Sequence, residues 1–573
     1  MLGERRPQAR LAYGLDANAV GMPPRPAGAW RDPVVWAVAV TVCCAYLLIS
    51  LLRLRRLAPT SWDLAIYTEY VKQLSRLHAP VVDVRGPGVN LLGDHFQVAV
   101  AVLAPLFRLF PSPATLLFAQ AVLTAVSVFP VAAAAIALTG RRTGRLIGFA
   151  YGFSWGLQQL VNFDFHEIAL AVPLLAFALS ALVRRRPLAV IGWALPLVLV
   201  KEDQGFTVAA IGVLLGVSAA FPPPPAGGWR ATIPLRRAGF GTDPAGRYQD
   251  GRWGDGHLAL WGGLFLLAWG LFWSVLAITV IIPHFSPLHE YYYWKDGGVV
   301  GGDQSFSLGG LLGQSADGGL VKLETVTLLL LPTAFAALGS PVTLAALPSL
   351  ALRFMSTNTA YWGTSWHYNA TLMPIVFIAA AEAIARLRAR PAVREPGPPG
   401  PPGPVTALGP AGRAVAAIVA CPAVRTAART AARTAVRTVA RTAVTAVARY
   451  GGVLMAAVAV ALAFQFPLGD LAQASTYQVS EHVAAADEAI AAIPDGATVQ
   501  ATLDLLAPLA ARTDAFWIGN PGNPLTQYVV FDAANSGYSS PVTNVAAFIR
   551  ENYPRAGYAE VFRRDDVYVF RRG

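Results

Sequence analysis

Charged residues are scarce in this chain of 573 residues. They make up 14% of it, and hydrophobic residues make up 55%, whereas soluble domains carry about 25% charged residues. The apolar runs are continuous rather than alternating, which argues against a transmembrane β-barrel. Many of them approach about 20 residues, the length an α-helix needs to cross a hydrocarbon core about 30 Å thick. The composition therefore predicts an α-helical polytopic membrane protein.

Cysteine is also rare, and a signal cleavage site is missing. Of the three cysteines, Cys43 and Cys44 lie in the first apolar run and Cys421 lies in a basic segment, so we expect no disulfide framework. The first run follows an arginine-containing leader without a small-residue cleavage site, which indicates a retained span. The net charge of +12 does not indicate nucleic acid binding, because much of the basic excess lies in loops and reports orientation.

The topology follows from the distribution of arginines. Those in residues 1–33 predict a cytoplasmic amino terminus. The short apolar segment 98–110 is either a span or an interfacial helix, and we choose the interfacial alternative because the basic loops then fall on the cytoplasmic side. A crossing there would invert everything after it. The predicted eleven spans are 34–52, 114–138, 146–161, 168–183, 187–200, 205–221, 258–282, 324–338, 342–354, 368–385 and 451–468.

This topology divides the chain into five parts. They are a cytoplasmic leader at 1–33, a transmembrane domain at 34–390, a cytoplasmic linker and arginine-repeat helix at 391–449, a last span at 450–468, and an extracytoplasmic domain at 469–573. The linker is rich in Pro and Gly and cannot form a packed core. The repeat places an arginine at every fourth position, which suits either an anionic inner leaflet or plain solvation.

The carboxy-terminal part reads as a small α/β domain. Helices are predicted at 481–493 and 544–551, strands at 498–502 and 528–532, and a hairpin at 558–571. It has no Gly-rich phosphate loop and no metal-ligand spacing. We therefore expect a scaffold or an acceptor-binding role for it.

Four polar segments interrupt the apolar pattern. They are Ser61-Trp62-Asp63, Gly93-Asp94-His95-Phe96, Asn162-Phe163-Asp164-Phe165-His166-Glu167 and Lys201-Glu202-Asp203. A charge in hydrocarbon costs roughly 2.5–3.5 kcal/mol even on a lenient scale, and the predicted topology puts all four segments at outer ends of spans. Helix capping, surface exposure or packing explains each one alone. Capping does not require one common side, so the coincidence favours a single polar site.

Such a site has the groups for general-base and phosphate chemistry. A carboxylate can accept a proton from a hydroxyl or bind a hard divalent cation. Lys201 can stabilise the charge of a departing phosphate. Nearby aromatic residues either stack on sugar faces or belong to the interfacial belt. They are Trp62, Trp155, Tyr361, Trp362 and Trp366.

In order and spacing, the four segments resemble the DUF2079 family of bacterial membrane proteins over roughly residues 60–390. That family is grouped with the GT-C class of glycosyltransferases. The resemblance implies a multi-span fold, a first outer loop with interfacial helices and a catalytic Asp, and a polyprenyl-phosphate sugar donor. Asp63 matches that acid by position. The class often pairs adjacent acids there, whereas here Leu64 follows and Glu69 is the next acid.

The leading hypothesis is inverting glycosyl transfer at the outer face of the plasma membrane. The donor is a polyprenyl-phosphate sugar, the acceptor is a hydroxyl of an envelope glycan or protein, and Asp63 is the base. The remaining predicted site residues are Lys201, His95, His367, Tyr361 and Trp366 for substrate or phosphate, Glu202 and Asp203 as support, and Asp94, Asp164, His166 and Glu167 as candidate ligands of Mg²⁺ or Mn²⁺.

Two alternatives belong to other classes. A carrier for a lipid-linked or anionic solute would use the same acids as a binding or proton-relay site. Carriers often contain internal repeats, and we find no convincing repeat here. A non-catalytic assembly protein that presents residues 469–573 is the second alternative.

Overall fold

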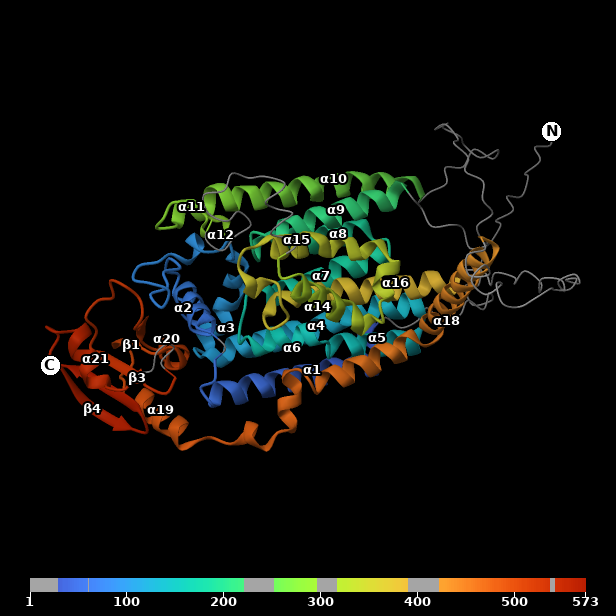
Figure 1. Cartoon of the computed structure of the whole chain (residues 1–573). Coiled ribbons are helices and arrows are strands. Elements are labelled where there is room, and N and C mark those ends of the chain that lie inside the picture. Colours follow the sequence, from blue (N-terminus) through green and yellow to red (C-terminus); the bar gives the residue numbers. More distant parts are fainter. Residues whose placement is uncertain (1–28, 60, 221–251, 296–316, 390–421, 536–541) are drawn as a thin grey trace, which may run out of the picture.

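The computed structural model describes residues 29–59, 61–220, 252–295, 317–389, 422–535 and 542–573. Helices form an elongated bundle, and a small α/β domain lies at one end of it (Figure 1). Most of the predicted leader and the Pro/Gly linker, with Cys421, lie outside the described residues. Side chains of the arginine repeat are also outside them.

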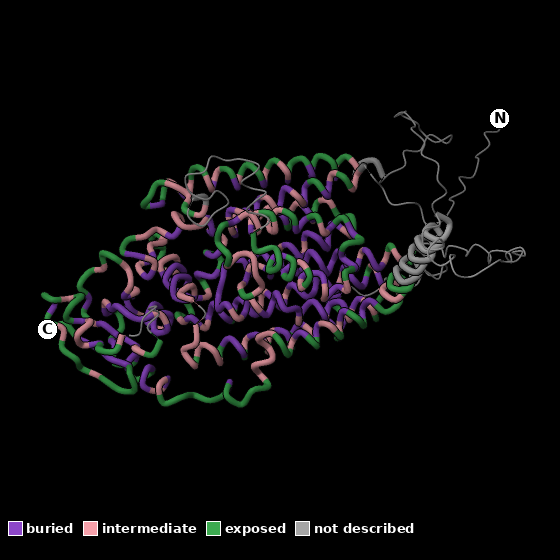
Figure 2. The backbone as a smooth tube through the Cα atoms, viewed as in Figure 1, coloured by how far each residue is buried: buried purple, intermediate pink, exposed green. Residues whose placement is uncertain are grey.

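Within the described residues, five helical segments are long and apolar enough to cross a membrane. They are α1 (Pro33–Arg55), α4 (Pro113–Thr139), Gly256–Phe285 of α10 (Arg252–Leu276) and α11 (Ile282–Phe285), His367–Ala389 with α16 (Leu372–Ala389), and Thr442–Ala463 of α18 (Pro422–Ala463). The outer face of α10 exposes Trp261, Phe265 and Phe272. Figure 2 shows the buried residues gathered in the centre of the bundle, so this apolar outer face suits contact with lipid chains.

The other predicted spans are shorter or interrupted helices. Pro196 lies in a 3-10 turn that ends one of them, and left-handed Ala334 and Phe335 end another after Pro332. These helices are α5 (Arg141–Gly152), α6 (Trp155–Asn162), α7 (Ile168–Val183), α8 (Pro187–Ala194), α9 (Gln204–Ala220), α14 (Gly319–Leu330) and α15 (Leu347–Met355). All the predicted spans are therefore helical, but the number of membrane crossings remains unconfirmed.

The two ends of the bundle carry different groups. At one end, Arg145 donates two hydrogen bonds of 3.0 Å to Asp32, and Arg388 donates to the carbonyls of Thr139 and Ala448. At the other end lie α2 (Asp63–Ser75), α3 (Ala104–Leu109) and the α/β domain (Figure 1). The predicted interfacial segment forms a 3-10 helix (Val98–Leu103) followed by α3. Which end faces the cytoplasm stays a prediction.

The α/β domain contains a five-stranded sheet of order β2-β1-β3-β5-β4. The strand β1 is parallel to both β2 and β3, and β5 is antiparallel to both β3 and β4. The strands are β1 (Thr498–Ala501), β2 (Asp514–Trp517), β3 (Tyr528–Asp532), β4 (Tyr558–Arg564) and β5 (Val567–Arg572), and the helices are α19 (Glu481–Ala491), α20 (Leu506–Ala510) and α21 (Val545–Asn552). The predicted helices, strands and hairpin are present, whereas β2 and α20 were not predicted.

This domain docks on α2 and the loop that follows it. The Lys72 ammonium donates a hydrogen bond of 2.7 Å to the carbonyl of Thr513, and Asn520 donates one of 2.9 Å to the carbonyl of Val84. The ring of Trp517 packs edge-on against Trp62, with 5.0 Å between centroids. Because Trp62 directly precedes α2, the domain is in contact with the start of the helix that carries Asp63.

Candidate functional site

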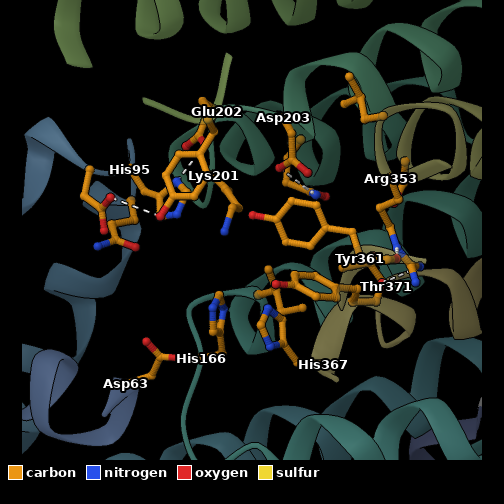
Figure 3. Close-up of a pocket in the computed structure, with 18 of the residues that line it drawn as sticks. Asp63, His95, His166, Lys201, Glu202, Asp203, Arg353, Tyr361, His367 and Thr371 are labelled. Atoms are coloured by element: carbon orange, nitrogen blue, oxygen red, sulfur yellow. Dashed lines mark hydrogen bonds and ion pairs between the residues drawn. The ribbon is translucent and has the colours of Figure 1, made fainter. Parts of the chain in front are cut away.

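A cavity of about 400 Å³ lies among α2, the loops that carry the other three polar segments, and the loop before α16 (Figure 3). Nine predicted site residues line it. They are Asp63, Asp94, His95, His166, Lys201, Glu202, Asp203, Tyr361 and His367. Segments far apart in the sequence thus contribute to one polar space, as the predicted topology requires.

Asp63 is the first residue of α2. The Ser61 hydroxyl donates a hydrogen bond of 2.8 Å to the Asp63 carboxylate and accepts one of 3.0 Å from the Asp63 amide, which fixes the start of the helix. A helix amino terminus favours a negative charge. Burial nevertheless raises the pKa of Asp63, an effect that His166 and Lys201 partly offset. Among the described residues no cation forms an ion pair with Asp63, so its carboxylate is available to the cavity (Figure 3).

The turn 162–167 explains why the side chains of Asp164 and His166 point to different places. Asp164 adopts a left-handed backbone with φ of 67°, which Asp tolerates better than most residues. The Gln120 amide donates to the carbonyl of Asp164 and accepts a hydrogen bond of 3.2 Å from the amide of His166. This clamp from α4 holds the turn, so that His166 lines the cavity while the Asp164 side chain lies elsewhere.

Glu167 is fully buried and joins three elements. Its carboxylate accepts a hydrogen bond from the Tyr67 hydroxyl, lies 2.5 Å from Nδ1 of His166 and 2.9 Å from Nζ of Lys201. Burial alone would raise the pKa of Glu167, but the charges of His166 and Lys201 hold it well below its usual value. A buried charge of this kind persists when it is paired and hydrogen-bonded. Glu167 therefore positions Lys201 and His166 at the cavity wall.

Glu202 holds the second polar segment, 93–96, against the fourth, 201–203. It accepts hydrogen bonds of 2.8 Å from Nδ1 of His95, 3.1 Å from the amide of Phe96 and 2.9 Å from the hydroxyl of Tyr291. Burial opposes ionisation, yet the charge and the hydrogen bond of His95, together with the charge of Lys201, lower the pKa of Glu202 to about 2. The predicted supporting role of Glu202 agrees with these contacts.

Gly93 makes this arrangement sterically feasible. A Cβ atom there would lie 2.5 Å from the backbone carbonyl of Phe285 and 2.6 Å from the amide of Ser286. Only glycine lets the segment 93–96 approach the end of α11 so closely. Any side chain at this position would displace His95 from Glu202.

His367 has an unusual environment for a buried polar residue. Its ring is stacked on His166, with 3.6 Å between centroids, and the residue is 2% exposed. Neither ring nitrogen has a hydrogen-bond partner within the described residues. Burying an unpaired polar group costs free energy, and His367 lines the cavity. A ligand in the cavity would supply the missing partner.

Sequence reasoning missed Arg353, which lines the cavity from α15. Its guanidinium donates to the carbonyls of Tyr361 and Gly363 at 2.8 and 3.1 Å and to the side chain of Asn369 at 3.0 Å. It therefore shapes the loop that presents Tyr361 and His367. An arginine inside a predicted span was itself a signal, because such charges are rare without a function.

Three of the predicted residues do not line this cavity, and one of them, Glu167, lies behind its wall as described above. Asp164 is 3.8 Å from Nε of Arg53 and lines a second, smaller cavity together with Asp504 of the α/β domain. Trp366 packs edge-on against Phe163 and does not line the main cavity.

The predicted metal ligands are therefore not gathered at one point. Asp94 is 3.6 Å from Nε of Arg85 and accepts a hydrogen bond of 3.1 Å from the Tyr293 hydroxyl. Glu167 is engaged with Tyr67, and Asp164 faces the second cavity. The described part of the chain contains no group of three or more His, Cys, Asp or Glu residues arranged to hold a metal ion.

Long apolar helices around a buried polar cavity define a polytopic helical protein of membrane type. Residues 53–396 match the model of the family described as predicted membrane protein (DUF2079). The chain belongs to this family. The proposed resemblance is thus confirmed over more than half of the sequence.

Other comparisons concern curated proteins and solved structures. No curated protein matches the chain. ArnT from Cupriavidus metallidurans bound to undecaprenyl phosphate is similar, with 12% identity, a TM-score of 0.49, and coverage of 94% of this chain and 97% of that chain. ArnT from the same organism in the apo state has 14% identity, a TM-score of 0.48, and coverage of 93% and 97%.

Proposed function

We propose that the chain is a plasma-membrane glycosyltransferase that moves a sugar from a polyprenyl-phosphate donor to an acceptor hydroxyl at the extracytoplasmic face. One observation carries the proposal: Asp63, a carboxylate without an ion-pair partner among the described residues, lines the same cavity as Lys201. The cavity volume of about 400 Å³ suits a small ligand, since such sites usually span about 300–1,000 Å³. Membership in DUF2079 and the resemblance to the GT-C class support this reaction.

In the proposed reaction, Asp63 accepts the proton of the acceptor hydroxyl. The acceptor oxygen forms a bond to the anomeric carbon as the bond from that carbon to the phosphate oxygen breaks, with inversion. The electron pair leaves with the polyprenyl phosphate. Burial raises the pKa of Asp63, which strengthens it as a base.

Lys201 stabilises the phosphate that departs. Burial opposes its charge, but Glu167 and Glu202 raise the pKa of Lys201 well above its usual value, so the ammonium remains charged. Glu167 engages it at 2.9 Å, leaving other N–H donors for the phosphate. A fixed charge aimed at developing negative charge is an effective catalytic device.

His367 and Tyr361 contact the donor in this proposal. The unpaired nitrogens of His367 bind a phosphate oxygen or a sugar hydroxyl, and the Tyr361 ring packs against the sugar. His95 and Asp203 complete the polar wall. The same assay, run with and without a chelator, tests whether transfer depends on Mg²⁺ or Mn²⁺.

The test is an assay of the purified full-length chain with a panel of polyprenyl-phosphate sugars, with and without a chelator. We expect sugar-dependent release of polyprenyl phosphate and formation of a glycosylated acceptor. If a donor lipid binds the chain but no lipid of the panel releases polyprenyl phosphate, glycosyl transfer is contradicted and the carrier alternative is favoured. Loss of release on chelation would establish the cation requirement.

A further inference from the structure

A third cavity, of about 350 Å³, lies where α2, α3 and the α/β domain meet, away from the candidate active site. Figure 1 shows α3 beside α2 and the domain at this end of the bundle. The cavity is lined by Lys72, Ser75, Arg76, Phe107, Arg108, Pro111 and Ala511. Its walls thus come from three parts of the chain.

Among the described residues, those that line the cavity include three cations and no carboxylate. Lys72 is 2% exposed, and its ammonium has one hydrogen bond, of 2.7 Å, to the carbonyl of Thr513. The nearest acid with an ion-pair contact is Asp514, whose carboxylate is 4.0 Å away and is itself half exposed. Burial raises the pKa of Glu69, one turn earlier on α2, to about 7, so that Glu69 neutralises Lys72 only in part.

The arginines retain donors for a ligand. Arg108 uses Nη1 to donate a hydrogen bond of 3.0 Å to the carbonyl of Ser75, which fixes α3 against α2. Burial lowers the pKa of Lys72, and the charge of Arg76, four residues later at the end of α2, also lowers it. Like charges at this spacing repel. The carboxyl end of a helix favours cations, and Lys72 and Arg108 each lie in the last turn of their helix. That preference does not explain why the ends of α2 and α3 meet at one cavity.

Exposed apolar side chains flank this basic cavity. Leu77 follows Arg76 directly, and Leu109 and Phe110 follow Arg108. They are 89%, 72% and 63% exposed. Apolar residues that enter the acyl boundary beside cations at the headgroup level are typical of interfacial membrane contacts. Pro111 then ends this segment before α4.

We propose that this cavity binds the phosphate headgroup of an anionic membrane lipid, with Lys72, Arg76 and Arg108 as its ligands and Leu77, Leu109 and Phe110 beside the acyl chains. Arginine and lysine both bind phosphate oxygens, and arginine does so with two parallel donors. The lipid would join α2 and α3 to the α/β domain through Lys72. The proposal is independent of glycosyl transfer and needs no activity for its test.

The test measures lipid retention by native mass spectrometry of the detergent-purified full-length chain. Three probes are titrated: short-chain phosphatidylglycerol, short-chain phosphatidylcholine, and glycerol phosphate, which carries the anionic group without acyl chains. The variant is Arg76→Gln/Arg108→Gln, since both side chains are exposed and their loss leaves the core intact. The matched control is Arg550→Gln/Arg555→Gln, which removes two exposed arginines from the α/β domain.

We expect the wild type and the control to retain phosphatidylglycerol. The test variant should bind it at least about tenfold more weakly, since each basic residue near an anionic lipid contributes measurably to binding. Equal retention by the test variant would overturn the site. Glycerol phosphate bound as tightly as phosphatidylglycerol would overturn the lipid as its source, and so would phosphatidylcholine bound equally well. Unchanged thermal unfolding of the variant shows that it has folded.

Discussion

Two of the carboxylate–imidazole pairs among the described residues, one in the bundle and one in the α/β domain, differ in their surroundings. In the bundle, Nδ1 of His166 lies 2.5 Å from Glu167, and His166 stacks on His367 at the cavity. In the α/β domain, Nε2 of His482 bonds to Asp532 at 2.7 Å, and its Nδ1 bonds to the carbonyl of Asp565 at 2.7 Å. Both ring nitrogens of His482 therefore have hydrogen-bond partners.

The difference shows what separates a structural pair from a candidate site. His482 has no nitrogen left for a ligand, so its pair joins α19 to β3 and to the turn between β4 and β5. His367 has two nitrogens without partners among the described residues, and it faces the cavity. A buried ion pair alone is weak evidence for function. The feature that indicates a ligand site is a buried imidazole nitrogen that has no hydrogen-bond partner among the described residues and faces a cavity.

The largest effect is expected from Asp63→Asn. Removing the proposed base should reduce transfer by roughly 10²–10⁴-fold, while thermal unfolding changes little, because Asp63 has no ion pair to lose among the described residues. Rates of polyprenyl phosphate release measure the change. The control is Asp83→Asn, in the loop that follows α2 and outside the cavity. Transfer retained by Asp63→Asn would remove this residue from the base role.

Glu167→Gln should impair both the site and the fold. It leaves Lys201 buried without its 2.9 Å partner, and breaking such a buried pair costs about 3–5 kcal/mol of stability. Thermal unfolding and transfer rates of the variant report the two losses. The double variant Glu167→Gln/Lys201→Met should regain stability without regaining transfer. If the double variant transfers sugar normally, Lys201 has no role at the leaving phosphate.

The two histidines give the direct comparison. His367→Phe keeps an aromatic ring against His166 and loses no hydrogen bond within the described residues, so stability should hold while transfer falls about tenfold, the effect of one lost donor. His482→Phe should lower the free energy of unfolding by about 1–3 kcal/mol, because Asp532 loses its partner, and should leave transfer intact. A loss of transfer in His482→Phe equal to that in His367→Phe would contradict the distinction.

The smallest effect is the pH dependence of the His482 pair. Burial would lower the pKa of His482, but Asp532 raises it above the usual value, so this contribution is full below about pH 6.5 and is lost as pH rises through the raised pKa. The pKa of Asp532 is lowered, since bonds from Asp504 and His482 outweigh its burial. Stability from the pair is then also lost at low pH.

Melting temperatures of the full-length wild type and of His482→Phe, compared across pH, measure this window. Their difference should be greatest at mildly acidic pH and should shrink on either side. A difference that grows with rising pH through the alkaline range would contradict the assigned direction.

The sequence was sufficient to predict the convergence of the site, because Asp63, His166 and Lys201 all lie at ends of apolar segments that the topology aligns. It was insufficient for Asp164, whose side-chain direction depends on a left-handed turn held by Gln120, 44 residues earlier. Such long-range contacts leave no local pattern.

In the α/β domain, predicted strands such as β3 are apolar runs bounded by turn residues. The missed strand β2 is only four residues long, Asp514–Trp517. Its position depends on pairing with β1, which no local pattern shows.

The docking of the α/β domain on α2 has a consequence for biosynthesis. Trp62 and Lys72 enter the membrane region early, but their partners Trp517 and Thr513 are translated near the end of the chain. The amino-terminal flank of Asp63 therefore acquires its packing only after the last helix has been inserted and the sheet has folded. A nascent or prematurely terminated polypeptide would hold its helices in place and still lack the contacts of Trp62 and Lys72 with the α/β domain.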